Sequence, residues 1–223
     1  AKVMQSPIHP LCVEFMDNKG IRCAEAFLNE KLPHSDKGYY VILSIDGNNE
    51  EVLDDQCVFI DELCTTNGAL EVLVADPVKI WKARKSFGEA NRARSLIFSA
   101  EDTVVPMSCI PEVVHKLAEL GAKYGVNIHI AAHAADGNVH ADILKEDMPM
   151  EQWLEVLPQL QDELYAFIYS LGGKLSGEHG IGYKRLALMK KYCNPVELKM
   201  MKAIKLALDP NRIMNPGKIF SLD

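Results

Sequence analysis

The residues best suited to chemistry lie in a segment that contains two histidines, His133-Ala-Ala-Asp-Gly-Asn-Val-His140. The surrounding stretch, Val126–Leu144, alternates apolar and polar residues on both sides of Asp136-Gly137. This pattern predicts two strands joined by a tight turn, because Asp-Gly tolerates the positive φ that a short hairpin needs. Such a hairpin would bring both imidazoles close to one point.

A second segment, Ser176-Gly-Glu-His-Gly-Ile-Gly182, supplies a carboxylate and a third imidazole. Its glycines remove side-chain bulk and permit unusual backbone conformations, so this loop can approach a neighbour closely. Two histidines and one carboxylate around an open position form a common set of ligands for a divalent metal. His133, His140 and Glu178 fit that set, and His179 would then be left as a base.

A simpler interpretation of these residues stays open. A histidine in a strand is usually a hydrogen-bonded structural residue, and Asp-Gly-Asn alone is only a turn. The metal hypothesis gains weight from Gly177-Glu-His-Gly180, because groups able to bind a metal then come from two separate loops.

The composition is that of an ordinary globular protein and excludes some classes of function. The 223 residues could form one large domain or two small ones, and 48% of them are hydrophobic while 25% are charged. A net charge of −7 argues against nucleic acid as a main partner, because phosphate binding needs clustered cations. The six cysteines form no CxxC pair, which indicates reduced, mostly buried thiols.

The predicted location is the cytoplasm. No signal peptide and no apolar run long enough to span a bilayer occur in the sequence. Attachment to the inner membrane through partner proteins is the alternative.

The remaining chain alternates short apolar runs with stretches of helical periodicity. The predicted strands are Leu11–Met16, Tyr39–Ile45 and Leu70–Val74, and 93–106 is expected to be irregular or partly strand. The predicted helices are Lys19–Lys31, Glu50–Cys64, Val78–Ala90, Pro111–Tyr124, Met150–Leu171, Tyr183–Tyr192 and Pro195–Leu208.

These elements favour an α+β fold in which helices cover an antiparallel or mixed sheet. The Asp-Gly hairpin is antiparallel by construction, which argues against a fully parallel sheet. The segment 11–74 fits one split βαβαβ half of a ferredoxin-like unit.

Several motifs, taken together, carry a resemblance to a known family. These are His133-x-x-Asp-Gly-Asn-x-His140, Ser176–Gly182 and Asp209-Pro…Asn215-Pro-Gly-Lys218, with further agreement at 11–17, 81–85 and 101–106. In this order they resemble the C-terminal domain of the FAD-linked oxidases of the vanillyl-alcohol-oxidase superfamily. That group includes the glycolate oxidase FAD subunit, the D-lactate dehydrogenases and the D-2-hydroxyglutarate dehydrogenases. The resemblance spans nearly all of the chain.

The sequence departs from this family in two ways. The family commonly has His-Ala-Gly-Asp-Gly-Asn where this chain has Ala134-Ala135, so a methyl group is added beside the turn. The family's FAD-binding domain, with its glycine-rich loop for the pyrophosphate, has no counterpart here. Residues 1–223 therefore resemble the C-terminal cap, or substrate, domain alone. We expect such a chain to bind FAD weakly and to self-associate through a surface near His179 and the tail from Asn211.

The resemblance implies an FAD-dependent oxidation of a small 2-hydroxy acid, of the D-lactate or glycolate type, to a 2-oxo acid. Hydride would pass to the flavin. The implied metal is zinc, manganese or iron, with His133, His140 and Glu178 as ligands and His179 as the catalytic base. The implied partners are an N-terminal FAD domain and iron–sulfur or electron-transfer flavoprotein subunits.

Arg84 is the candidate for binding the carboxylate of the substrate, because a guanidinium fork binds both oxygens. The alternative is a solvated helix face shared with Lys82 and Lys85. Asp142 has the strand parity of His140 and could contact the substrate, support a ligand or simply be exposed.

Asn215 is the candidate for a cofactor contact, because the matching tail of the family packs against the flavin ring. Its alternative is a turn residue before Pro216. His129 has the parity of His133 and is expected to support a ligand or the core.

Two other classes of function stay open. One is a stand-alone iron oxygenase with a two-histidine, one-carboxylate site, although that chemistry is usually housed in an all-β barrel. The other is a non-catalytic ligand-binding or assembly module on a ferredoxin-like sheet, which leaves Gly177–Gly180 without an explanation. A flavin spectrum of the full-length gene product would separate the flavoenzyme from both.

Overall fold

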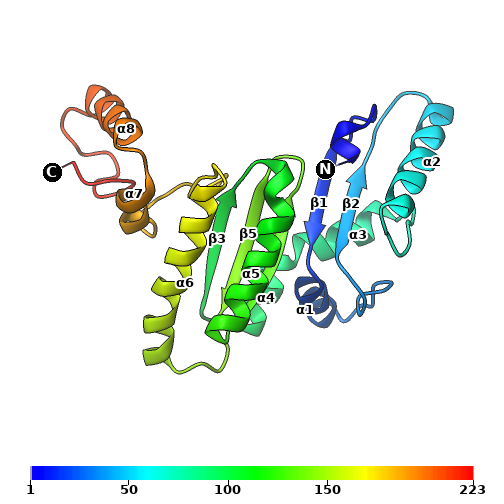
Figure 1. Ribbon diagram of the computed structural model, residues 1–223, viewed down its shortest axis with the longest axis horizontal. Coiled ribbons are helices and arrows are strands. Elements are labelled where there is room, and N and C mark those ends of the chain that lie inside the picture. Colours follow the sequence, from blue (N-terminus) through cyan, green and yellow to red (C-terminus); the bar gives the residue numbers. More distant parts are fainter. Residues whose placement is uncertain (1, 223) are drawn as a thin grey trace.

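The fold is built on one open sheet, and the computed structural model describes residues 2–222 (Figure 1). Its five strands lie in the order β2-β1-β4-β5-β3. They are β1 (Cys12–Met16), β2 (Tyr40–Ser44), β3 (Phe98–Val104), β4 (Asn127–His133) and β5 (Asn138–Leu144). Every neighbouring pair is antiparallel. The predicted α+β class and the predicted hairpin are therefore confirmed.

Helices cover both faces of this sheet. They are α1 (Asn18–Leu28), α2 (Glu50–Thr66), α3 (Pro77–Lys85), α4 (Phe87–Arg94), α5 (Ile110–Tyr124), α6 (Met150–Ser170), α7 (Leu186–Tyr192) and α8 (Pro195–Leu208), with short 3-10 helices η1 (Val3–Gln5) and η2 (Met107–Cys109). The larger core lies between α5, α6 and one face of the hairpin, where Ile130, Val139 and Ile143 point. A smaller core, with Met16, Ala131 and Phe87, lies under α1 and α4 on the other face.

Local sequence explains where several of these helices begin and end. The carboxylate of Asp76 accepts hydrogen bonds from the backbone N–H groups of Val78 and Lys79, and Pro77 occupies the first helical position of α3, as predicted. Gly125 ends α5 in the left-handed conformation that glycine favours (φ 66°). Asp17 caps α1 in the same way as Asp76 caps α3, by accepting from the N–H of Gly20.

The split β-α-β unit lies in the middle of the chain rather than at its start. Strands β3 and β4 both run antiparallel to β5, which lies between them, so β3, α5 and β4 form that unit. The prediction that 11–74 forms it is wrong, because Leu70–Val74 is not a strand. Leu70, Leu73 and Val74 are exposed, and no strand of the described chain pairs with this stretch.

Two further predictions of elements need correction. The single helix predicted over Val78–Ala90 is two helices: α3 ends at Lys85, Ser86 is the cap residue between them, and α4 begins at Phe87, whose ring is buried. The stretch 93–106, expected to be irregular or partly strand, contains the full edge strand β3.

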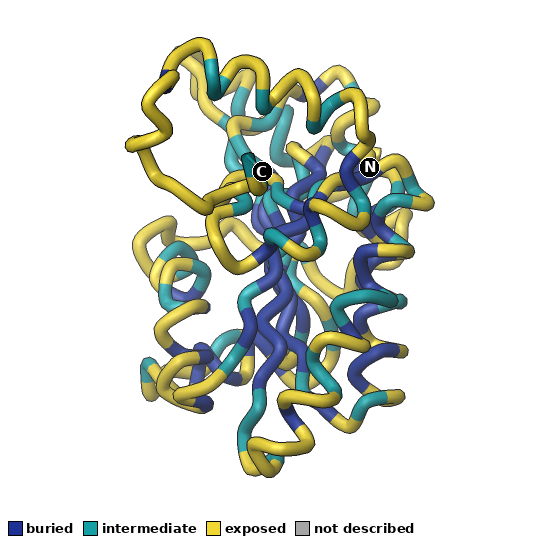
Figure 2. The backbone as a smooth tube through the Cα atoms, turned by 90° about the vertical axis from the view of Figure 1, so that its left-hand side faces the viewer, coloured by how far each residue is buried: buried dark blue, intermediate teal, exposed yellow. Residues whose placement is uncertain are grey.

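The backbone is most deeply buried along the strands, and α8 with the C-terminal tail is largely exposed (Figure 2). All six cysteines are free thiols, but only Cys23 and Cys193 are buried, so "mostly buried" was too strong an expectation. Across residues 2–222, no helix combines the length and the apolar character needed to cross a membrane.

Candidate metal centre

The β4–β5 hairpin places two histidine side chains side by side on one face of the sheet. In its register His133 pairs with Asn138 and Ala131 pairs with His140, so both imidazoles point to the face opposite α5 and α6. Their ring centroids are 5.2 Å apart and the rings are nearly perpendicular. Gly137, with φ 77°, closes the turn; a Cβ there would lie 2.0 Å from the backbone oxygen of Val105. The predicted approach of His133 and His140 is confirmed.

A carboxylate of β3 holds the Gly-rich loop, residues 176–182, over these histidines by hydrogen bonds. Asp102 Oδ2 accepts hydrogen bonds from the hydroxyl of Ser176 (2.6 Å) and from the backbone N–H groups of Gly177, Glu178 and His179 (3.1, 3.1 and 2.8 Å). The side chain of Asn138 lies so close to Gly177 that a Cβ there would be 2.4 Å from its Oδ1. The loop therefore needs both the carboxylate and the glycine to reach the hairpin.

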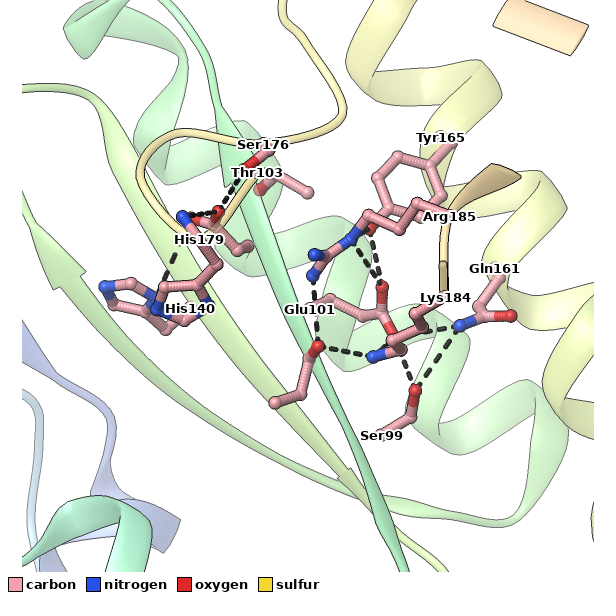
Figure 3. Close-up of polar contacts among 12 residues, drawn as sticks. Ser99, Glu101, Thr103, His140, Gln161, Tyr165, Ser176, His179, Lys184 and Arg185 are labelled. Carbon is pink, nitrogen blue, oxygen red and sulfur yellow. Dashed lines mark hydrogen bonds and ion pairs between the residues drawn. The ribbon is translucent and has the colours of Figure 1, made fainter. Parts of the chain in front are cut away.

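The end of the same loop is held on the opposite face of β3. Glu101 is fully buried and accepts hydrogen bonds from Tyr165 (2.5 Å) and Lys184 (3.0 Å). Arg185 donates to the backbone oxygens of Gly180 and Ala100. Figure 3 shows His140 and His179 on one side of this strand and Glu101 with its partners on the other.

The loop brings the carboxylate of Glu178 to the two imidazoles. Glu178 Oε1 lies 3.0 Å from His140 Nε2 and 3.6 Å from His133 Nε2. One ligand atom from each of these three residues lies within 4.8 Å of the other two. Two imidazole nitrogens and a carboxylate, on a partly exposed face, match the donors that zinc, manganese or iron prefer and leave positions for a substrate.

Glu14 of β1 holds His133, although the sequence analysis gave Glu14 no role. His133 Nδ1 lies 2.7 Å from Glu14 Oε1, and Arg84 Nε donates to Glu14 Oε2 at 2.8 Å. The Arg84 side chain is 13% exposed, so its assignment to a solvated helix face is wrong. Its Nη2 is buried and has no hydrogen-bond partner among the described residues. Arg84 thus contacts the same constellation and has one buried donor without a partner among the described residues.

His179 lies beside the three candidate ligands His133, His140 and Glu178 but is not one of them. Its ring stacks on His140, with centroids 5.1 Å apart, and its Nε2 is 3.5 Å from Glu178 Oε1. Asp102, His140 and His179 also place ligand atoms within 4.8 Å of one another. That second grouping is less suitable, because Asp102 is fully buried and one of its oxygens already accepts four hydrogen bonds.

Burial sets the protonation of this face. It lowers the pKa of His140 to about 4, despite the opposing effect of the Glu178 carboxylate, so His140 is neutral near pH 7, which is the ligand form of the imidazole. For Asp102 burial acts to raise the pKa, but the hydrogen bonds from Ser176 and the loop outweigh it and the pKa is lowered. Asp102 therefore stays a carboxylate that accepts from the loop.

Two predicted residues lie apart from this group. Asp142 shares the face of His140, as predicted, but its Oδ2 accepts a hydrogen bond from Asn91 of α4 (2.7 Å), whose Oδ1 lies 2.7 Å from His129 Nδ1. Asn215 is exposed in the tail, which returns to the loop through a hydrogen bond from Ile219 N to Gly182 O. A substrate contact for Asp142 and a cofactor contact for Asn215 stay predictions.

Glu14 and Asp102 are residues of the candidate site to which the sequence analysis gave no role. Each is a carboxylate in a strand, at a position whose side chain is buried, and a buried carboxylate is uncommon without a partner. The parity of Glu14 followed from the predicted strand Leu11–Met16, whereas 93–106 was expected to be irregular or partly strand. The partners of both residues lie in distant segments: His133 on β4 for Glu14, and the loop 176–179 for Asp102.

The chain is similar in sequence to proteins of a known family. The family model described as "FAD linked oxidases, C-terminal domain" matches residues 1–219. A D-lactate dehydrogenase of Anaerostipes hadrus is 32% identical over 219 residues, which cover 94% of this chain and 46% of that protein. The glycolate oxidase subunit GlcD of Escherichia coli strain K12 is 30% identical, covering 97% of this chain and 44% of that protein.

Solved structures agree in fold. A p-cresol methylhydroxylase with bound substrate aligns over 95% of this chain and 47% of its own, with a TM-score of 0.63 and 15% identity. A 4-ethylphenol oxidase from Gulosibacter chungangensis aligns over 94% of this chain and 47% of its own, with a TM-score of 0.58 and 13% identity. The chain spans about half the length of the relatives it matches.

Proposed function

The chain belongs to the C-terminal domain family of the FAD linked oxidases, and we propose that it is the substrate- and metal-binding domain of an FAD-dependent 2-hydroxy-acid dehydrogenase. The relatives named D-lactate dehydrogenase and glycolate oxidase subunit support a substrate of the D-lactate or glycolate type. The observation that carries the proposal is the convergence of His133, His140 and Glu178 within 4.8 Å on a partly exposed face.

In this proposal those three residues hold one divalent metal ion. A 2-hydroxy acid offers a hydroxyl and a carboxylate that can bind the same ion, and coordination makes the hydroxyl more acidic. The open face of the group leaves room for both oxygens, because His133 is 33% exposed and Glu178 is 48% exposed.

His179 serves as the base. Its Nε2 lies next to the Glu178 carboxylate and its ring is half exposed, so it can accept the hydroxyl proton of a substrate bound at the metal. The hydride of the α-carbon passes to FAD, which is the chemistry that the cofactor supplies when bound.

Arg84 orients the substrate. Its Nε is used by Glu14, and its Nη2 has no partner among residues 2–222. Because Nη2 is buried, the side chain would have to be uncovered before this donor could meet a substrate carboxylate. Because the same Glu14 also holds His133, the arginine is fixed relative to the metal ligand. Asp142, on the same strand face as His140, is assigned a supporting role toward the substrate.

The FAD would be bound chiefly by an N-terminal domain, since the relatives are about twice as long as this chain. The tail with Asn215 and the exposed apolar side chains of α8 are proposed to meet that domain and its flavin. Iron–sulfur or electron-transfer flavoprotein subunits are the proposed electron acceptors, and the proposed location is the cytoplasm.

The test uses the complete product of the gene that encodes this chain. We expect a flavin absorption band that is bleached anaerobically by D-lactate, glycolate or D-2-hydroxyglutarate, and we expect one equivalent of a divalent metal. The matched variant Arg84→Lys keeps the charge but loses the fork, so KM should rise at least about tenfold with the metal retained. A protein without flavin, or with flavin that no 2-hydroxy acid bleaches, would contradict the proposal.

A further inference from the structure

We propose that Asp102 is a positioning residue that supports the metal-binding tautomer of His140 with one carboxylate oxygen and fixes the Gly-rich loop with the other. This inference deepens the proposed function, because it concerns how the metal ligands are held in place. Asp102 belongs to neither the hairpin nor the loop, and it lies between them on β3.

The first oxygen, Oδ2, determines where Glu178 lies. It accepts four hydrogen bonds from 176–179, three of them from consecutive backbone N–H groups. Consecutive N–H groups that converge on one anion form a backbone nest. Glu178 lies inside that nest, so its side chain leaves the loop at a point that Asp102 fixes.

The second oxygen, Oδ1, is buried and has no hydrogen-bond partner among the described residues. A buried carboxylate oxygen without a donor costs free energy. Oδ1 lies 3.9 Å from His140 Nδ1, about one ångström beyond hydrogen-bond length. That nitrogen is the one on the far side of the ring from Glu178, which faces Nε2 at 3.0 Å.

The two carboxylates compete for the proton of His140. In the metal-free chain a proton on Nε2 can be donated toward Glu178, which is 3.0 Å away. A metal ion at Nε2 would displace that proton, and a proton on Nδ1 would then point a donor at the unpaired Oδ1 of Asp102. Metal-binding histidines commonly donate their second nitrogen to a carboxylate, which fixes the ring and the tautomer.

At His133 the corresponding contact with a carboxylate is already at hydrogen-bond length. There the carboxylate of Glu14 is already at hydrogen-bond distance, 2.7 Å from Nδ1, and Nε2 faces Glu178. Each histidine of the group thus has a buried carboxylate behind it. Asp102 differs from Glu14 because it also holds the loop, so it couples the second histidine to the third ligand.

Asp102→Asn separates the two roles. Four donors converge on the Oδ2 position, so the amide oxygen of asparagine stays there and the NH2 group faces His140. That NH2 group is a donor, so it opposes a proton on Nδ1 of His140, which is the tautomer that leaves Nε2 free for a metal. Ser176→Ala is the matched control, since it removes one donor to Oδ2 and leaves Oδ1 unchanged.

The first measurement is zinc affinity at pH 7.5, by competition with a chelator. Asp102→Asn should lose about 10–100-fold and Ser176→Ala less than about threefold. The second measurement is the tautomer of His140 in the zinc-loaded wild type, from the nitrogen chemical shifts in long-range proton–nitrogen NMR spectra. We expect a proton on Nδ1 and the metal on Nε2.

An unchanged zinc affinity for Asp102→Asn, or zinc bound through Nδ1 of His140 in the wild type, would overturn the inference. Failure of the wild type to bind zinc at all would instead count against the proposed metal site, on which the inference rests.

Discussion

His133 on β4 and Glu14 on β1 are direct partners in the antiparallel register, and His133 Nδ1 lies 2.7 Å from Glu14 Oε1. The two residues are 119 positions apart in the sequence. This contact orients the ring so that Nε2 faces Glu178, and the second oxygen of Glu14 holds Arg84. One buried carboxylate thus connects the proposed metal ligand to the proposed substrate-binding arginine.

Substituting Glu14→Ala should weaken zinc binding by about 10–100-fold, because His133 loses the partner that fixes its ring. It should also lower the free energy of unfolding by about 3–5 kcal/mol, because a largely buried guanidinium loses its counter-charge. Chelator competition and urea unfolding measure the two effects.

Glu25→Ala is the control. Glu25, on α1, is about as buried as Glu14 and contacts no imidazole within residues 2–222. The Glu25→Ala chain should therefore lose stability but keep its zinc affinity. Equal zinc affinities for wild type and Glu14→Ala would refute this role.

Substituting Gly177→Ala should displace the Gly-rich loop without unfolding the domain. The added methyl group would lie 2.4 Å from the buried Asn138 Oδ1, which cannot retreat easily. We expect zinc affinity to fall at least about tenfold, as for loss of a supporting contact, with an unchanged far-ultraviolet circular dichroism spectrum. Gly88→Ala, in α4, has open space and should bind zinc normally. A Gly177→Ala chain that binds zinc as tightly as Gly88→Ala would contradict the close approach described above.

The hairpin was predictable because its determinants are local. Alternation over Val126–Leu144 and the Asp-Gly turn fixed which residues share a face, so His133 and His140 could be paired from the sequence. Glu178 was predictable from its place between glycines. Asp142 was correctly placed on the face of His140, but its partner Asn91 belongs to a distant helix and diverts it from the metal group.

The contacts between distant segments were not predictable in the same way. Glu14 and Asp102 depend on the strand order β2-β1-β4-β5-β3, which periodicity alone does not encode. Leu70–Val74 has the apolar content of a strand, yet no strand pairs with it in the described chain. Ser86 divides a stretch whose apolar spacing suits one continuous helix, and Phe87, the first residue of α4, is buried in the smaller core with Met16 and Ala131, contacts that periodicity does not encode.

His129 should make the chain sensitive to acid. Burial, more than the nearby Arg94 and Lys19, lowers the pKa of His129 from 6.5 to about 4, so the folded state binds this proton less readily than the unfolded state. Its contribution is therefore fully present above pH 6.5 and is lost as the pH falls toward 4, by up to about 3 kcal/mol.

The comparison that isolates this effect is wild type against His129→Asn in urea unfolding between pH 7.5 and 4.5. At pH 7.5 the variant should be less stable by about 1–3 kcal/mol, because Asn91 Oδ1 loses its buried partner. The difference should shrink as the pH falls. A difference in the free energy of unfolding that stays constant across this pH range would show that His129 does not titrate as described.

The chain alone should self-associate through helix α8. Val196, Met200, Ile204 and Leu208 recur every four residues and are all exposed, so they form one apolar stripe, and Ile213 and Met214 of the tail are exposed as well. The double substitution Met200→Lys and Ile204→Lys should reduce association measured by sedimentation velocity at least about tenfold in Kd. Leu96→Lys, at an exposed site before β3, is the control and should leave association unchanged. Association that survives the double substitution would place the contact elsewhere.

The most direct test of the metal centre is metal content after single substitutions in the complete gene product. Ligands hold the ion, whereas a base only moves a proton, so His133→Ala, His140→Ala and Glu178→Ala should each lose the metal. His179→Ala should keep it while turnover of D-lactate or glycolate falls about 10²–10⁴-fold. Elemental analysis beside the turnover assay gives both quantities on one preparation. A His179→Ala protein without metal, together with a Glu178→Ala protein that retains it, would contradict the assignment of these two neighbouring residues.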